Sequence, residues 1–170
     1  MNKIFKYISN KSGDNTYYLK SLNYVDEVDL NLYCSLDKVF SVQEIYSLLG
    51  DENWRSHLVA YTFALAKGAK EGLSEFKATL TRGSFVSPQL VVAIAMLGER
   101  ESSKFLLSML KNPTVSHKSK GAIIAALPYC SVSKASLEED ALDLSEFSMG
   151  HSIAEQHLKF WSRRAYSPKQ

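Results

Sequence analysis

The chain has 170 residues, of which 45% are hydrophobic and 22% are charged, and this is the size of one globular domain. Only eight glycines and four prolines, together with 11% aromatic residues, exclude a disordered or fibrous chain. Twenty Lys and Arg against eighteen Asp and Glu leave a formal charge of +2, which is too small to indicate a nucleic-acid or membrane partner by itself. We therefore expect a single domain over residues 1–170.

Residues 1–41 are the part of the chain whose pattern is hardest to interpret. Several tyrosines flank the polar segment NKSGDN. The stretch VDEVDLNLY, residues 25–33, fits either a helix or an alternating strand. We expect this region to form an irregular or helical cap at the N-terminal end.

Residues 42–134 contain a repeat. The segments LLGDENWRSHLVAYTFALAKG (48–68), TLTRGSFVSPQLVVAIAMLGE (79–99) and MLKNPTVSHKSKGAIIAALPY (109–129) align without gaps, at offsets of 31 and 30 residues. A leucine, two large apolar residues and an alanine recur in the aligned columns: Leu49/Leu80/Leu110, Trp54/Phe85/Val115, Phe63/Ile94/Ile124 and Ala64/Ala95/Ala125. Recurrence of this kind predicts stacked supersecondary units, here helix pairs.

Each repeat predicts a short first helix and a more apolar second helix. The first helices are expected at Val42–Leu49, Leu73–Thr81 and Ser102–Lys111, and the second at Trp54–Lys67, Pro88–Leu97 and His117–Leu127. Clusters of Gly, Asn, Asp, Pro and Ser separate the two helices of each pair. The run LVVAIAML, residues 90–97, also fits a buried strand, but the aligned alanines favour a helix.

Residues 135–165 predict a fourth, degenerate helix pair. Its helices are expected at Ser136–Phe147 and His151–Arg164, with Gly150 between them. A stack of helix pairs needs atypical units at its ends, because an ordinary unit would leave an apolar face exposed there. We expect residues 135–165 to be a C-terminal helical cap, and residues 166–170 to be a tail.

The second helices resemble those of HEAT repeats. VVAIAMLG (91–98) matches best, followed by YTFALAKG (61–68) and AIIAALPY (122–129), while Asp51 and Arg55 match residues typical of the turn and of the start of the second helix. The resemblance covers about residues 42–129. It implies an all-α fold, a short α-α superhelix of HEAT-like repeats, and a habit of binding large ligands. It implies no chemistry.

Motifs for catalysis or cofactor binding are not found in the sequence: GxGxxG, GxxxxGK[ST], HExxH and GxSxG. His151 and His157 are six residues apart, which places them on opposite faces of a helix rather than in a metal pair. Cys34 and Cys130 lie among apolar neighbours, and no apolar run approaches the roughly 20 residues that span a bilayer. We expect a cytoplasmic protein that is not an enzyme, with no cofactor, no metal and no membrane partner.

The non-core positions of the second helices, with the turn before the middle one, give the candidate partner-binding residues. They are Trp54, Arg55, His57, Tyr61, Arg82, Gln89, His117, Lys118 and Lys120. The lysines of this set belong to a basic segment, since residues 101–134 carry five Lys and one Glu, and the acidic segment 135–170 follows. Trp54 fits either the core or an interface, where a Trp beside an Arg is typical of the centre.

Three functions are compatible with these features. The first is a protein-binding module, in one form an inhibitor or immunity-type protein that neutralises a toxin by occlusion, which needs shape and charge only. The second is nucleic-acid binding, as in the HEAT-like alkylpurine DNA glycosylases, but a charge of +2 is small for a binder of many phosphates. The third is an enzyme or small-ligand carrier similar to HEAT-like lyases that attach pigments to proteins, which would need a deep polar pocket. We expect the first.

Overall fold

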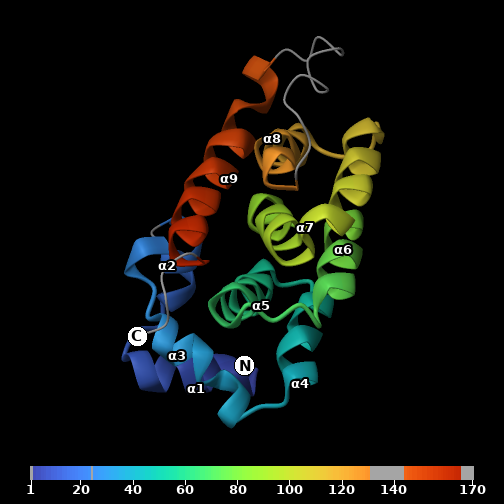
Figure 1. Ribbon diagram of the computed structural model, residues 1–170. Helices are drawn as coiled ribbons and strands as arrows, with labels where there is room; N and C mark the ends of the chain where they lie inside the picture. Colours follow the sequence, from blue (N-terminus) through green and yellow to red (C-terminus); the bar gives the residue numbers. More distant parts are fainter. Residues whose placement is uncertain (1, 24, 131–143, 166–170) are drawn as a thin grey trace.

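A computed structural model of the chain describes residues 2–23, 25–130 and 144–165, and all regular elements in these ranges are helical (Figure 1). The predicted all-α class is therefore confirmed. Residues 90–97 lie within a helix and not a strand. The stretch 25–33, which also fitted a strand, forms the short helix η1 (Val25–Glu27) and the start of α3 (Leu30–Cys34).

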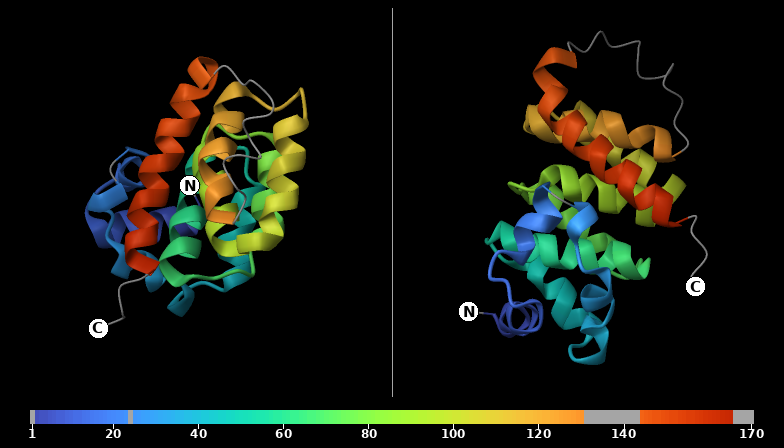
Figure 2. Two further views of the ribbon diagram at one scale, coloured as in Figure 1. Left: turned by 45° about the horizontal axis from the view of Figure 1, so that its top comes forward. Right: turned by 90° about the vertical axis from the view of Figure 1, so that its left-hand side faces the viewer.

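The helices lie in three layers (Figures 1 and 2). The middle layer holds α5 (Trp54–Lys67), the first part of α7 (Ser87–Lys111) and α8 (His117–Ala126). One outer layer holds α4 (Val42–Ser47), α6 (Leu73–Arg82) and the second part of α7. The other outer layer holds α1 (Lys3–Ser12), α2 (Tyr17–Asn23), α3 and α9 (Leu144–Ala165). Short helices η2 (Leu36–Lys38), η3 (Leu48–Gly50) and η4 (Leu127–Cys130) complete the described chain.

The middle layer is buried on both faces. Residues 56–64 of α5 and residues 87–95 of α7 are all buried, with no exposed stripe. A helix with one face on solvent would show polar residues at helical spacing, whereas a helix buried all round lies at the centre of a molecule. The second helices therefore do not line an open face, because the N-terminal helices and α9 cover it.

One boundary prediction is wrong at α7. The helices expected at Pro88–Leu97 and Ser102–Lys111 form one helix, Ser87–Lys111. The residues between them read Gly-Glu-Arg-Glu, and they include three good helix formers and no proline, so helical hydrogen bonding continues through them. Figure 1 shows the ribbon turning between the two parts, which places the first in the middle layer and the second in the outer layer.

A second boundary prediction is wrong at Gly150, which does not separate two helices but lies inside α9. A Cβ atom at Gly150 would lie 1.8 Å from the Lys118 carbonyl oxygen, and one at Gly121 of α8 would lie 2.1 Å from the Phe147 carbonyl oxygen. The glycines thus allow the backbones of α8 and α9 to touch. Accordingly α9 lies alongside α8 and does not continue the stack. Residues 136–143 of the predicted fourth pair, and the tail 166–170, lie outside the described residues.

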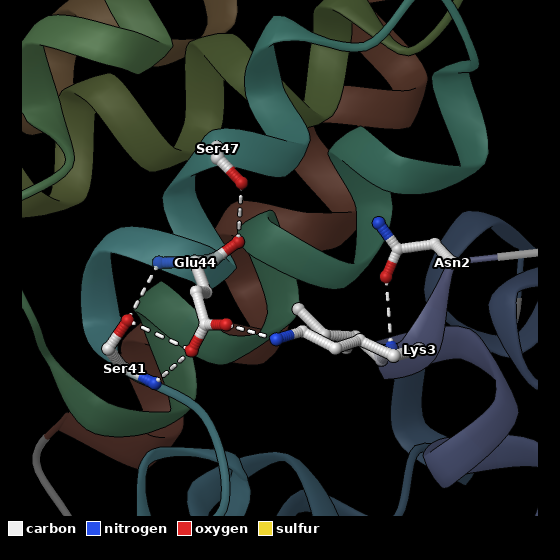
Figure 3. A network of polar contacts seen from close by, with 6 residues as sticks. Asn2, Lys3, Ser41, Glu44 and Ser47 are labelled. Atoms are coloured by element: carbon white, nitrogen blue, oxygen red, sulfur yellow. Dashed lines mark hydrogen bonds and ion pairs between the residues drawn. The ribbon is translucent and has the colours of Figure 1, made fainter.

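A polar network fixes α1 to α4 (Figure 3). Ser41 caps α4 by a capping box, in which its hydroxyl accepts from the Glu44 N–H at 3.2 Å and its own N–H donates to the Glu44 carboxylate at 2.9 Å. The same carboxylate forms an ion pair with Lys3. The hydrogen bonds from Lys3 and from Ser41 hold the pKa of Glu44 at about 2, below its ordinary value.

Candidate binding surface

The candidate residues fall into two groups. His57, Tyr61 and Gln89 are buried, exposing 3%, 0% and 1% of their surface. The prediction that these three lie on a free surface is wrong, because α2 and α9 cover Tyr61 and Gln89, and the turns at Asp51 and Ser84 cover His57. The others reach the surface: Trp54, Arg55, Lys118 and Lys120 are half-buried, and Arg82 and His117 are exposed.

Tyr61 and Gln89 belong to a buried polar junction between α2, α5, α7 and α9. The Tyr61 hydroxyl donates to His157 Nδ1 at 2.8 Å and accepts from Trp161 Nε1 at 2.7 Å. Gln89 Nε2 and His157 Nε2 both lie 3.3 Å from the Leu22 carbonyl oxygen. This carbonyl is in the last turn of α2, where backbone oxygens lack intrahelical partners. The junction therefore satisfies a helix end and ties four helices together.

The hydrogen bonds of the junction assign one protonation state to His157. Because Nε2 faces the Leu22 carbonyl oxygen, which can only accept, the ring proton is on Nε2, and Nδ1 is left to accept from the Tyr61 hydroxyl. Burial lowers the pKa of His157 to about 4, although the hydrogen bond to Leu22 acts in the opposite direction. Burial also raises the pKa of Tyr61 well above its ordinary value. The junction is thus uncharged at neutral pH, as a structural contact requires.

His57 and Arg82 hold the turns between neighbouring repeats. His57 Nε2 donates to the Asp51 carbonyl oxygen at 2.8 Å, and Nδ1 lies 2.8 Å from Ser84 Oγ. Burial lowers the pKa of His57. The Arg82 guanidinium donates to the Leu49 carbonyl oxygen at 2.7 Å. Both side chains satisfy carbonyls in or next to η3, so their contacts within the chain are structural.

Aromatic rings and cations lie next to one another along one edge of the molecule. We call this group the cation–aromatic strip, and it consists of Tyr18, Arg55, Trp54, Phe85 and Lys118. The Trp54 ring lies 5.7 Å from that of Tyr18 and 5.2 Å from that of Phe85. The Arg55 guanidinium lies 4.6 Å from the Trp54 centroid and 5.0 Å from that of Tyr18. Lys118 Nζ lies 4.4 Å from the Phe85 centroid. These separations are those of attractive ring–ring and cation–π contacts.

The strip follows the N-terminal ends of the middle helices. Trp54 is the first residue of α5, Phe85 lies just before α7 begins, and Lys118 is in the first turn of α8. The three helices run in the same direction, so these ends share one edge of the molecule (Figure 2). The positive ends of their dipoles therefore meet at the strip and add to its two cations.

Phe85 is the exposed centre of the strip. Its side chain is 59% exposed, although the next residue, Val86, is fully buried. Lys118 lies over the Phe85 ring and also donates from Nζ to the Phe85 carbonyl oxygen at 2.7 Å. Partial burial lowers the pKa of this lysine. The Phe85 ring thus contacts both Trp54 and Lys118 while most of its surface stays exposed.

The remaining two candidates of α8 lie beyond the strip. His117 Nδ1 is 3.6 Å from a carboxylate oxygen of Glu146 on α9, and its ring meets that of Phe147 at 5.3 Å. Lys120 is half-buried and is not in contact with the strip's rings in the described residues. Of the basic residues predicted at 117–120, only Lys118 therefore joins the strip.

Phe85 and Tyr18 were not among the predicted surface residues. Phe85 shares a repeat column with Trp54 and so suggested a core position, whereas the structure shows that this column marks the edge. The signal that could have found it is the preceding Gly83-Ser84, because glycine and serine are typical of an exposed turn. Tyr18 had no such signal, since its contact with Trp54 joins residues far apart in the sequence.

In residues 2–23, 25–130 and 144–165, no group of three or more His, Cys, Asp and Glu is arranged to hold a metal ion. None of the helices described has the length and apolar character needed to cross a membrane. Comparisons of the chain with protein-family models, curated proteins and solved structures gave no match.

Proposed function

We propose that this chain is a non-enzymatic protein-binding module whose contact surface is centred on the cation–aromatic strip. The observation that supports it is Phe85, which is 59% exposed and yet contacts both the Trp54 ring and the Lys118 ammonium group. Interface centres are enriched in Trp, Tyr and Arg, and exposed aromatic side chains that are held in place often mark such centres. The strip combines these residue types in one place.

The strip is also organised before any partner binds. Arg55 and Trp54 hold each other, and Lys118 is held by a hydrogen bond to the backbone at Phe85. Immobilising a flexible side chain at an interface costs about 0.5–1.5 kcal/mol. Because part of this cost is already met on folding, the strip can bind with a small contact area. Specific protein recognition benefits from such an arrangement.

The finer form of this proposal is an inhibitor or immunity-type protein that acts in the cytoplasm and occludes a toxin. Occlusion requires only complementary shape and charge, which a strip on a rigid edge can supply. We further propose that the inner and outer helices of residues 42–126 are a short HEAT-like superhelix whose inner face is closed by the terminal helices. The N-terminal edge would then be the surface left for a partner.

The strip also has features of single-stranded nucleic-acid sites, where bases stack on aromatic rings beside basic residues. Stacking needs free ring faces. Here Arg55 covers faces of Trp54 and Tyr18, and Lys118 covers a face of Phe85. This coverage, together with the formal charge of +2, favours a protein partner over a nucleic acid.

Affinity capture from the source cells tests the proposal. We expect the wild-type chain to retain a protein that the Trp54→Ala/Phe85→Ala variant retains at least about tenfold less, since hot-spot truncations cost about 2 kcal/mol or more. Val39→Ala is the matched control, because Val39 is an exposed apolar side chain, at 51%, outside the strip. Equal capture by all three chains, or capture that disappears after nuclease treatment, would contradict the proposal. Loss of the captured protein's own activity on binding would support the inhibitor form.

A further inference from the structure

We infer that the partner presents an acidic segment in which carboxylates flank an apolar side chain, and that this segment binds across Arg55, Trp54, Phe85 and Lys118. The inference rests on the proposed function, because it names the chemistry of the partner for the same strip. It follows from which groups the strip leaves available and how they are spaced along it.

Arg55 is the first carboxylate site. Its guanidinium lies over the rings of Trp54 and Tyr18, and in the described residues it forms no ion pair with an acidic side chain. A cation–π contact does not use the N–H groups as hydrogen-bond donors, so a carboxylate can still accept two parallel hydrogen bonds from the guanidinium. A flat cation held in this way recognises a carboxylate better than a mobile one, since its orientation is already set.

Lys118 is the second carboxylate site. Its ammonium group has three donors, and the Phe85 carbonyl oxygen accepts one of them at 2.7 Å. In the described residues, Lys118 has no acidic partner. A carboxylate beside Lys118 would compensate for the partial burial of its charge. The N-terminal ends of α5 and α8 add positive potential in the same places.

The apolar part of the segment is expected between these two cations. Trp54 and Phe85 lie 5.2 Å apart between them, and Phe85 is the largely exposed ring. A leucine or phenylalanine laid against Phe85 would bury apolar surface while carboxylates on each side meet Arg55 and Lys118. The order of the strip, cation–ring–ring–cation, is therefore complementary to the order acid–apolar–acid.

Two other partner classes are less well matched to this order. A membrane surface would require aromatic rings that project beyond their polar neighbours into the lipid interface. In the strip the cations lie over the rings instead. A nucleic acid would offer phosphates to the cations, but the formal charge of +2 is small for a partner that carries many phosphates.

The test is an NMR titration of the ¹⁵N-labelled full chain with peptide probes at low salt, about 50 mM. The probe is acetyl-EELFEE-amide, and the matched peptides are QQLFQQ, which removes the charge, and EEGSEE, which removes the apolar pair. We expect EELFEE to shift the Trp54 indole N–H and the amides of residues 84–86 and 117–119. The two matched peptides should bind at least about tenfold more weakly, since each lacks about 1.4 kcal/mol or more of contacts.

Variants of the chain sharpen the test. Arg55→Gln is expected to weaken EELFEE binding about tenfold, which corresponds to about 1.4 kcal/mol. Lys120→Gln is the matched control, because it removes a charge from α8 outside the strip, and it should change the affinity less than about twofold. The unperturbed remainder of the spectrum shows whether each variant keeps the fold. Equal effects of the two substitutions would overturn the inference, since the peptide would then be attracted by the charge of the chain as a whole and not by the strip.

The remaining outcomes separate this inference from the proposed function. If QQLFQQ binds to the same residues as tightly as EELFEE, the acidic partner is wrong while the protein-binding strip stands. If EELFEE shifts no strip residue at several millimolar, the inference is also overturned, and the proposed function is judged by the capture experiment alone. If a dT oligonucleotide or vesicles with phosphatidylserine shift the strip at lower concentration than EELFEE, both proposals fail in favour of a nucleic acid or a membrane.

Discussion

The junction and the strip use the same kinds of side chain in opposite surroundings. In the junction, Tyr61, His157 and Trp161 are buried, and their polar atoms meet one another or a backbone carbonyl. In the strip, Trp54 and Arg55 meet through a ring face, and Phe85 remains exposed to water. Both clusters include residues of α5 and of the outer layer that holds α2 and α9. The difference is that α9 covers the flank of the middle helices, while no described helix covers the strip at their N-terminal ends.

This contrast separates stability from binding. A buried polar group without a partner costs about 1–3 kcal/mol, so each member of the junction is needed for the fold. An exposed ring contributes less to folding, because water reaches it in both the folded and the unfolded chain. Substitutions in the junction should therefore lower the free energy of unfolding. Substitutions in the strip should mainly lower the affinity for a partner.

The two tryptophans give the largest expected effect. Trp161→Ala removes a buried ring and leaves the Tyr61 hydroxyl without a donor, so we expect a loss of about 3–5 kcal/mol of unfolding free energy. Trp54→Ala removes a half-buried ring at the edge, and the expected loss is about 1–2 kcal/mol. Urea denaturation followed by far-UV circular dichroism measures both. Equal losses would contradict the division between junction and strip.

Acidification should weaken the junction before it affects the strip. The pKa of His157 is about 4 in the folded chain and near 6.5 when the chain unfolds, so the unfolded state binds the proton first. The contribution of neutral His157 is complete above about pH 6.5, is lost as the pH falls towards 4, and amounts to about 3 kcal/mol. His57, whose pKa is also lowered by burial, adds to this loss. Urea midpoints measured between pH 7 and pH 4 check the slope.

A variant assigns the pH dependence to His157. His157→Gln retains an amide that can donate to Leu22 but cannot be protonated in this range. Its stability at pH 7 should be lower than that of wild type, and its loss between pH 6.5 and pH 4 should be smaller. If the unfolding free energy of the variant changes with pH as steeply as that of the wild type, His157 is not the group that titrates. The assignment of a buried, neutral His157 to the junction would then be wrong.

Much of the fold was predictable because helical periodicity is a local property. The second helices at Trp54–Lys67 and within Ser87–Lys111 were found from apolar runs and flanking turn residues. Gly150 was misread because a glycine that ends a helix and a glycine that admits a neighbouring backbone look the same in sequence. The deciding contact, with the Lys118 carbonyl, joins residues 32 positions apart.

The surface was less predictable, because exposure depends on what covers a helix. Tyr61 and Gln89 look like polar positions on apolar helices, but both are buried, with Tyr61 bonded to His157 of α9 and Gln89 bonded to the Leu22 carbonyl oxygen of α2. Trp54 and Phe85 look like core residues, but Trp54 is only half-buried and Phe85 is largely exposed. Periodicity indicates which face of a helix is apolar, but it does not show which faces the terminal helices will cover.

The smallest expected effect comes from the removal of one oxygen atom. Tyr61→Phe keeps the ring but removes the hydroxyl that joins Trp161 Nε1 to His157 Nδ1, so we expect a loss of about 1–3 kcal/mol. Tyr18→Phe is the matched control in the strip. Its ring, which meets Trp54 and Arg55, is retained, and the change should stay within about 0.5 kcal/mol.

A double-mutant cycle shows whether this hydroxyl acts through the junction. Tyr61→Phe and His157→Gln remove two ends of the same hydrogen bond, so their losses in unfolding free energy should be less than additive, with a coupling of about 0.5–3 kcal/mol. Tyr18→Phe and His157→Gln belong to separate clusters and should add to within about 0.5 kcal/mol. If Tyr18 coupled to His157 as strongly as Tyr61 does, the strip and the junction would be one cooperative unit. Binding at the edge would then be linked to the packing of α9 against the middle helices.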